Sequence, residues 1–115
     1  MVNRIVVGAH YGLRDWLLQR ISAVVMVVYA VGFVLCVLPR LPLSFEDWRA
    51  WFAIPFVKIS TLMFMLSLLL HAWVGVRDIV MDYVKPFGVR LCLQVLVILA
   101  LIVYAIWTVT LLWSV

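Results

Sequence analysis

The stretch HAWVGVRDIVMDYVKP, residues 71–86, holds the side chains of this sequence best suited to chemistry. His71 lies in a long apolar run, and Asp82 and Tyr83 follow 11 and 12 residues later. Eleven residues make about three turns at 3.6 residues per turn, so His71 and Asp82 share a face if one helix joins them. The rise of ~16 Å predicts an imidazole inside a membrane and a carboxylate with a phenol at its boundary.

An ionisable side chain at the depth expected for His71 is costly and usually functional. Neutral imidazole binds iron well, which favours a metal or haem ligand; a hydrogen bond to a backbone carbonyl, Ser or Thr of a neighbouring helix is the alternative. No His, Cys or acid three or four residues away completes a multidentate metal site. Ala72 and Gly75 instead keep the helix face low enough for a flat macrocycle. Because His10 belongs to the aqueous N-terminal segment, the second axial ligand of a haem would come from another polypeptide.

Tyr83 and Asp82 suit a quinone headgroup. The phenolic O–H can donate to a quinone carbonyl, and the carboxylate can orient the phenol or relay protons from water. The alternatives are a tyrosine that anchors the chain in the interface and a solvated aspartate. Arg20 can pair with a haem propionate or extend to lipid headgroups. For Arg77 and Asp78 we expect a local or lipid-facing polar contact.

Composition predicts the elements that carry these residues. The 115 residues are 69% hydrophobic and 12% charged, with a mean hydropathy of +1.25, more apolar surface than a soluble domain of this size can bury. Residues 21–38, 59–76 and 91–115 contain no Asp, Glu, Lys or Arg. Runs of this length span a ~30 Å hydrocarbon core as helices. We therefore expect an all-α, single membrane-anchor domain over 1–115, with transmembrane helices at about 16–38, 59–80 and 91–113.

A short helix is expected between the first two spans. The segment PRLPL ends the first helix, and SFEDWRAWFAIP follows it. Ser44 can cap a helix, acidic residues suit its N-terminal end, and three aromatic residues form one side. This pattern predicts a helix lying on the membrane interface and ending before Pro55. A contact with a partner protein is the alternative role for it.

Charge placement predicts the orientation. The cations on one side of the membrane outnumber those on the other, six against three: Arg4, Arg14, Arg20, Arg77, Lys85 and Arg90 against Arg40, Arg49 and Lys58. The positive-inside rule then places the N-terminus in the cytoplasm. No cleavage site follows the first apolar run, so we expect a multi-pass protein of a bacterial inner membrane that keeps its N-terminus. The net charge of +4 forms no basic cluster that would indicate nucleic-acid binding.

Three motifs in order, R-I-S-A at 20–23, H-A-W-V-G at 71–75 and D-Y-V-K-P at 82–86, resemble the cytochrome b556-associated hydrophobic membrane anchor of bacterial succinate dehydrogenase. The resemblance covers essentially the whole chain. It implies that this anchor and a second, haem-ligating anchor share one haem b, each giving one axial histidine. His71 matches that ligand, Tyr83 the ubiquinone-binding tyrosine, Asp82 the acid beside it and Arg20 an arginine near the propionates.

The same resemblance implies a respiratory complex II of the tricarboxylic acid cycle. In that family a flavoprotein subunit oxidises succinate and an iron–sulfur subunit passes the electrons to ubiquinone, so the anchor performs no covalent chemistry alone. The charged pair at 77 and 78 departs from the family pattern, in which neutral residues are expected. A fumarate reductase anchor is the nearest alternative.

A proton or cation path through His71, Asp82 and Tyr83 is a further alternative. The three spans contain no inverted repeat or broken helix of the kind that transporters use, which argues against it. A purely structural scaffold would leave the depth of the histidine unexplained.

Overall fold

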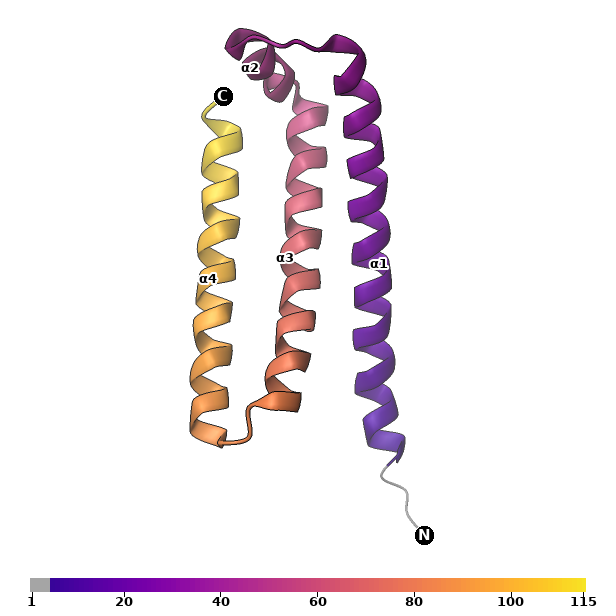
Figure 1. Cartoon of the computed structure of the whole chain (residues 1–115), viewed down its shortest axis with the longest axis vertical. Coiled ribbons are helices and arrows are strands. Elements are labelled where there is room, and N and C mark those ends of the chain that lie inside the picture. Colours follow the sequence, from indigo (N-terminus) through magenta and orange to yellow (C-terminus); the bar gives the residue numbers. More distant parts are fainter. Residues whose placement is uncertain (1–4) are drawn as a thin grey trace.

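The computed structural model describes the backbone of residues 5–115 and the side chains of residues 12–115. It contains α1 (Ile5–Val37), a 3₁₀ turn (Leu38–Arg40), α2 (Phe45–Ala53), α3 (Pro55–Tyr83) and α4 (Phe87–Trp113). Figure 1 shows the three long helices side by side, with α3 between α1 and α4 and the short α2 across one end. The described part has no strand. The predicted fold class, three apolar spanning helices plus a short helix between the first two, is confirmed.

The helices extend beyond the apolar runs that predicted them. The first begins at Ile5 and not near Asp15, and the second runs from Pro55 to Tyr83. Pro55 occupies the first turn of α3, where its missing N–H costs no helical hydrogen bond. An apolar run measures the lipid-facing length of a helix, whereas the helix itself continues until a residue breaks it. The segment left between the second and third predicted spans, residues 81–90, therefore shrinks to residues 84–86, which include Pro86.

The local signals for α2 hold in detail. The backbone N–H of Asp47 donates to Ser44 Oγ at 3.1 Å, and the Ser44 N–H donates to Asp47 Oδ2 at 3.1 Å, a reciprocal capping box. The helix ends at Ala53, before Pro55. The Trp48 ring stacks on Phe33 of α1, with centroids 6.2 Å apart, which fixes α2 against the end of the first helix.

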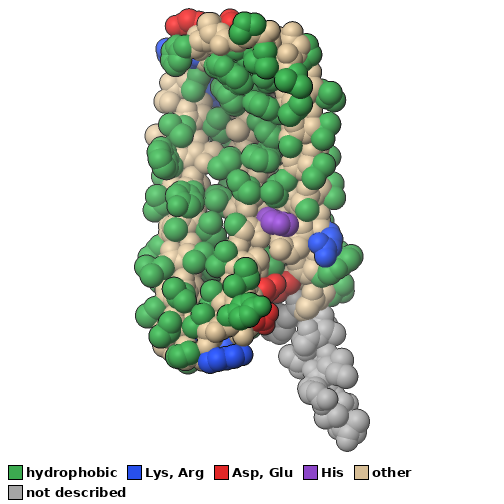
Figure 2. Space-filling view, in the orientation of Figure 1, with side chains coloured by type: hydrophobic (Ala, Val, Ile, Leu, Met, Phe, Trp, Pro, Cys, Tyr) green, Lys and Arg blue, Asp and Glu red, His purple; other side chains and the backbone are tan. Residues whose placement is uncertain are grey.

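Side-chain burial within the chain is small. A few residues form the buried apolar set: Val37, Val57, Val74, Val80 and Leu112. Large apolar side chains cover most of the face drawn in Figure 2, as expected of helices that contact lipid or other polypeptides. Polar contacts between helices supplement this packing, among them a hydrogen bond of 2.6 Å between Tyr29 of α1 and Thr61 of α3. The side chain of His10, and all of Arg4, lie outside the described residues.

Candidate functional site

His71 lies in the second half of α3, partly exposed, and contacts α1 through one ring nitrogen. Its Nδ1 is 3.0 Å from Ser22 Oγ. Ser22 is 3% exposed, and its Oγ also lies 3.1 Å from the backbone carbonyl oxygen of Gln19, one turn earlier. The contact that was weighed as the alternative to ligation, a Ser or Thr of a neighbouring helix, is therefore present. It occupies one of the two ring nitrogens.

These two contacts favour one of the two tautomers of His71. A carbonyl oxygen can only accept, so the hydrogen bond to Gln19 uses the single hydroxyl proton of Ser22. The remaining contact, between Ser22 Oγ and Nδ1, then requires the proton to be on the imidazole. In the tautomer that satisfies both contacts, Nδ1 carries the proton and Nε2 keeps its lone pair. An Nε2 lone pair is what an imidazole offers to a metal.

Nε2 of His71 has no hydrogen-bond partner among the described residues. Figure 2 shows a histidine side chain at the surface among apolar side chains, with a Lys or Arg side chain beside it and Asp or Glu side chains towards the nearer end of the bundle. No group of three or more His, Cys, Asp or Glu side chains in the described part could hold a bare metal ion. The donor set, one imidazole with a free ring nitrogen at the surface, fits a haem that takes its other ligand elsewhere.

Gly75 lies one turn after His71, but it faces α1. A Cβ built at Gly75 would meet Gln19 Nε2 at 3.8 Å, an ordinary van der Waals distance. The glycine therefore belongs to the packing between α1 and α3, and the structure gives no sign that it clears space for a macrocycle. Ser22, Gln19 and Asp15 repeat at intervals of three and four residues along α1, which puts them on the face that meets α3.

Asp15 forms an ion pair with Arg77 of α3 near the end of the bundle that carries Asp82. The Asp15 and Arg77 side chains are only 28% and 27% exposed, and Asp78 Oδ1 lies 3.8 Å from the same guanidinium nitrogen. The expected local contact of Arg77 with Asp78 is therefore accompanied by a stronger one across two helices. This interhelical pair was missed, because the sequence does not tell which face of α1 meets α3.

Asp82 and Tyr83 end α3, which is continuous from His71. The same-face relation of His71 and Asp82 thus has the unbroken helix that it requires. Both end residues are exposed, Tyr83 by 80%, and no hydrogen bond joins their side chains to another described residue. The structure does not bring them to His71: they lie three turns away along the same helix. They remain available to a ligand or to another polypeptide.

Arg20 is exposed on α1, two residues from Ser22, with its guanidinium carbon 5.4 Å from the centroid of the Trp16 ring. This contact is a cation–π interaction, and the Arg20 guanidinium donates no hydrogen bond to a described side chain. Arg20 makes no ion pair with a described residue. It can therefore bind a carboxylate bidentately without losing an existing partner.

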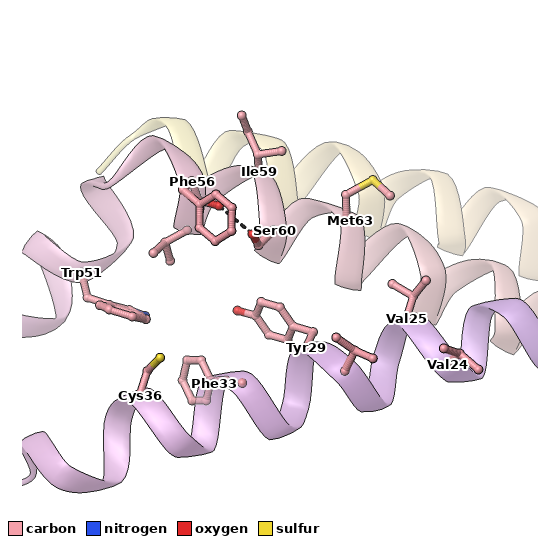
Figure 3. Close-up of a pocket in the computed structure, with 13 residues that line it drawn as sticks. Val24, Val25, Tyr29, Phe33, Cys36, Trp51, Phe56, Ile59, Ser60 and Met63 are labelled. Atoms are coloured by element: carbon pink, nitrogen blue, oxygen red, sulfur yellow. Dashed lines mark hydrogen bonds between the residues drawn. The ribbon is translucent and has the colours of Figure 1, made fainter.

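An apolar groove of about 500 Å³ lies elsewhere, between α1 and α3 at the end near α2. Figure 3 shows Tyr29, Phe33 and Cys36 of α1 lining it opposite Phe56, Ser60 and Met63 of α3, with Trp51 of α2 closing one end. None of the four candidate site residues lines this groove: Arg20, His71, Asp82 and Tyr83 all lie outside it. The candidate site is accordingly the surface around His71, together with the exposed end of α3.

Two comparisons with known proteins concern the chain as a whole. Residues 3–112 match the family model described as the succinate dehydrogenase/fumarate reductase transmembrane subunit. The chain is also 42% identical over 102 residues to the succinate dehydrogenase hydrophobic membrane anchor subunit of Coxiella burnetii (strain RSA 493 / Nine Mile phase I), and the match covers 89% of each chain.

Proposed function

The chain belongs to the succinate dehydrogenase/fumarate reductase transmembrane subunit family, and from this we propose that it gives one axial histidine to a haem b and part of a ubiquinone site to a succinate:ubiquinone oxidoreductase. It is a multi-pass membrane anchor, non-catalytic on its own. The observation that carries the proposal is the state of His71. Its Nδ1 lies 3.0 Å from Ser22 Oγ, and its Nε2 has no hydrogen-bond partner among the described residues.

His71 is the residue that would hold the haem iron, with Nε2 as the ligand atom. The sequence contains two histidines, and His10 precedes the first apolar run, so the opposite axial position falls to a second, haem-ligating anchor. Arg20, whose guanidinium carbon lies 5.4 Å from the centroid of the Trp16 ring, would bind a propionate through its N–H donors. When bound, the haem would supply a one-electron store within the membrane, and His71 and Arg20 would hold it in place.

Tyr83 and Asp82 would form one wall of the quinone pocket. The phenolic O–H of Tyr83 can donate to a quinone carbonyl and so favour the charge that grows on that oxygen during reduction. Asp82, beside it at the membrane boundary, can orient the phenol and pass protons from water. Their exposure at the end of α3 supports a role toward a ligand or partner surface.

The proposed partners are the second haem-ligating anchor, an iron–sulfur subunit and a flavoprotein subunit, assembled at the cytoplasmic face of a bacterial inner membrane with the N-terminus of this chain inside. The relative from Coxiella is named as a succinate dehydrogenase subunit, which favours succinate oxidation. The family description also covers fumarate reductase, whose anchor is the second candidate.

The ligand assignment is tested in the purified complex by replacing His71 with alanine. We expect the reduced-minus-oxidised haem b bands, normalised to flavin, to lose most of their intensity or to acquire a five-coordinate character. His10→Ala is the matched control, because it removes the other histidine, and it should leave the spectrum unchanged. A His71→Ala complex with the wild-type haem spectrum would refute the assignment. A colourless homo-oligomer without flavin would favour transport instead.

A further inference from the structure

We propose that Ser22 is a positioning residue for the haem iron: through its hydrogen bond it fixes the tautomer and orientation of His71 and sets how strongly that imidazole donates electrons. The inference rests on the proposed ligation by His71. It assigns a role to a residue of α1 that touches neither iron nor substrate. Its basis is the chain of contacts from Nδ1 of His71 to Ser22 Oγ at 3.0 Å and from Ser22 Oγ to the Gln19 carbonyl at 3.1 Å.

The direction of these two hydrogen bonds determines how Ser22 acts on the imidazole of His71. Ser22 donates its proton to the Gln19 carbonyl, and this polarises Oγ and makes it a better acceptor for the imidazole N–H. An imidazole whose N–H is donated to an acceptor is a more basic ligand at its other nitrogen. Ser22 therefore increases electron donation from Nε2. Stronger donation stabilises the ferric form relative to the ferrous form.

Burial makes this contact hard to replace. Ser22 is 3% exposed, so water has little access to take the place of its hydroxyl group. Without the acceptor, the Nδ1–H group would be left unpaired or the ring would turn to find another partner. Either change alters the ligand's basicity or its plane. Ser22 also ties the position of α3 to that of α1 at the level of the imidazole.

The test uses three variants of the assembled complex: Ser22→Ala, Ser22→Thr and Ser60→Ala. Thr keeps a hydroxyl at the position, and Ser60 is a matched control because its hydroxyl binds only a carbonyl of its own helix, that of Phe56 at 2.7 Å. We expect the haem midpoint potential of Ser22→Ala to rise and the largest g value of its low-spin ferric signal to shift. Ser22→Thr and Ser60→Ala should match the wild type in both measurements.

The outcomes separate this inference from the proposed function. If His71→Ala destroys the haem signal while Ser22→Ala leaves potential and g value unchanged, ligation stands and the role of Ser22 is wrong. If Thr shifts both values as much as Ala, side-chain packing is the cause and the inference also fails. If His71→Ala leaves the haem unaltered, the proposed function itself fails.

A measurement on the unmutated complex covers the case in which Ser22→Ala does not assemble. Redox-difference infrared spectra with ¹⁵N-labelled histidine report which ring nitrogen is protonated and whether that N–H is donated to an acceptor. A band assignable to a hydrogen-bonded Nδ1–H, lost in His71→Ala, supports the inference. A free N–H, or a proton on Nε2, overturns it.

Discussion

At the scale of single residues, Tyr83 is proposed to bind the quinone, yet its side chain makes no hydrogen bond to another described residue. Its side chain is 80% exposed at the last position of α3. Tyr83→Phe removes only the phenolic O–H. One hydrogen bond worth roughly 1–1.5 kcal/mol corresponds to about a five- to twelvefold loss in kcat/KM for ubiquinone reduction. Quinone-dependent and dye-dependent succinate oxidation by the purified complex are to be compared, and only the first should fall.

Tyr104→Phe is the control for this change, because Tyr104 is an exposed tyrosine of α4 and carries no proposed role. It should leave both activities at the wild-type level. Equal losses of quinone-dependent and dye-dependent activity in Tyr83→Phe would mean that the phenol supports assembly, and its place in the quinone site would have to be given up.

The sequence predicts such residues well when their meaning depends on one helix alone. The separation of His71 from Asp82 follows from a count of residues along α3, and the continuous helix confirms that count. Ser22 could not be paired with His71 in this way. Its partner depends on how α1 is rotated and shifted against α3, which no residue count supplies. The only available hint was the spacing of Asp15, Gln19 and Ser22 along one face.

At the scale of elements, the ion pair of Asp15 and Arg77 joins α1 to α3 near the end that carries Asp82. Both side chains are about three-quarters buried, so removing one partner leaves the other as an unpaired, partly buried charge. Arg77→Gln should cost roughly 1–3 kcal/mol, between the values for exposed and fully buried pairs. Asp15→Asn should cost less, because Arg77 retains Asp78 at 3.8 Å. Thermal unfolding of the complex, followed by circular dichroism at one scan rate, ranks the variants.

A double-mutant cycle completes this experiment. The Asp15→Asn/Arg77→Gln variant should lose less than the sum of the two single changes, because neither charge is left alone. Reversing the pair is a poorer control, since an acid at position 77 would stand beside Asp78. Additive losses, or a greater loss in Asp15→Asn than in Arg77→Gln, would show that the pair does not hold the helices as described.

Helix ends are where the sequence-based expectation was weakest. The apolar run beginning at residue 21 led to a predicted start near Asp15, yet α1 begins at Ile5. Lipid sets the length of an apolar run, whereas backbone hydrogen bonding sets the length of a helix, and the two agree only where a breaker follows directly. Pro55 and Pro86 are such breakers, and each marks the start of the next helix. The capping box at Ser44 was likewise predictable because its partners are three residues apart.

At the scale of the whole molecule, the three long helices bury little of their apolar surface against one another. Val74 is the largest fully buried side chain in the described part, whereas Val28, Leu35 and Leu96 are more than 60% exposed on α1 and α4. Lipid covers some of that surface, and in a membrane complex other polypeptides cover the rest. An anchor built in this way has its functional groups on its outer faces. This agrees with an imidazole nitrogen open to one side and a phenol exposed at one end.

The same elongated shape makes the orientation testable. The molecule is 63 Å long, with α2 at one end and the 84–86 turn at the other. More cations flank the end that holds this turn and the N-terminus, which predicts that it faces the cytoplasm. After Cys36 and Cys92 are replaced by serine, single cysteines at Glu46 of α2 and Lys85 of the turn report each end. A membrane-impermeant maleimide should label Glu46→Cys in intact spheroplasts and Lys85→Cys only after permeabilisation.

The assembled complex matters for this last measurement, because flavoprotein and iron–sulfur subunits docked at the cytoplasmic face would shield Lys85→Cys. Labelling is therefore compared in membranes with and without the peripheral subunits, which chaotropic salt removes. The proposed arrangement requires stripping to raise labelling at position 85 and to leave position 46 unchanged. The opposite pattern would place α2 beside the catalytic subunits. The positive-inside argument and the proposed quinone wall at Asp82 and Tyr83 would then both be wrong, since that wall lies at the end that the complex must cover.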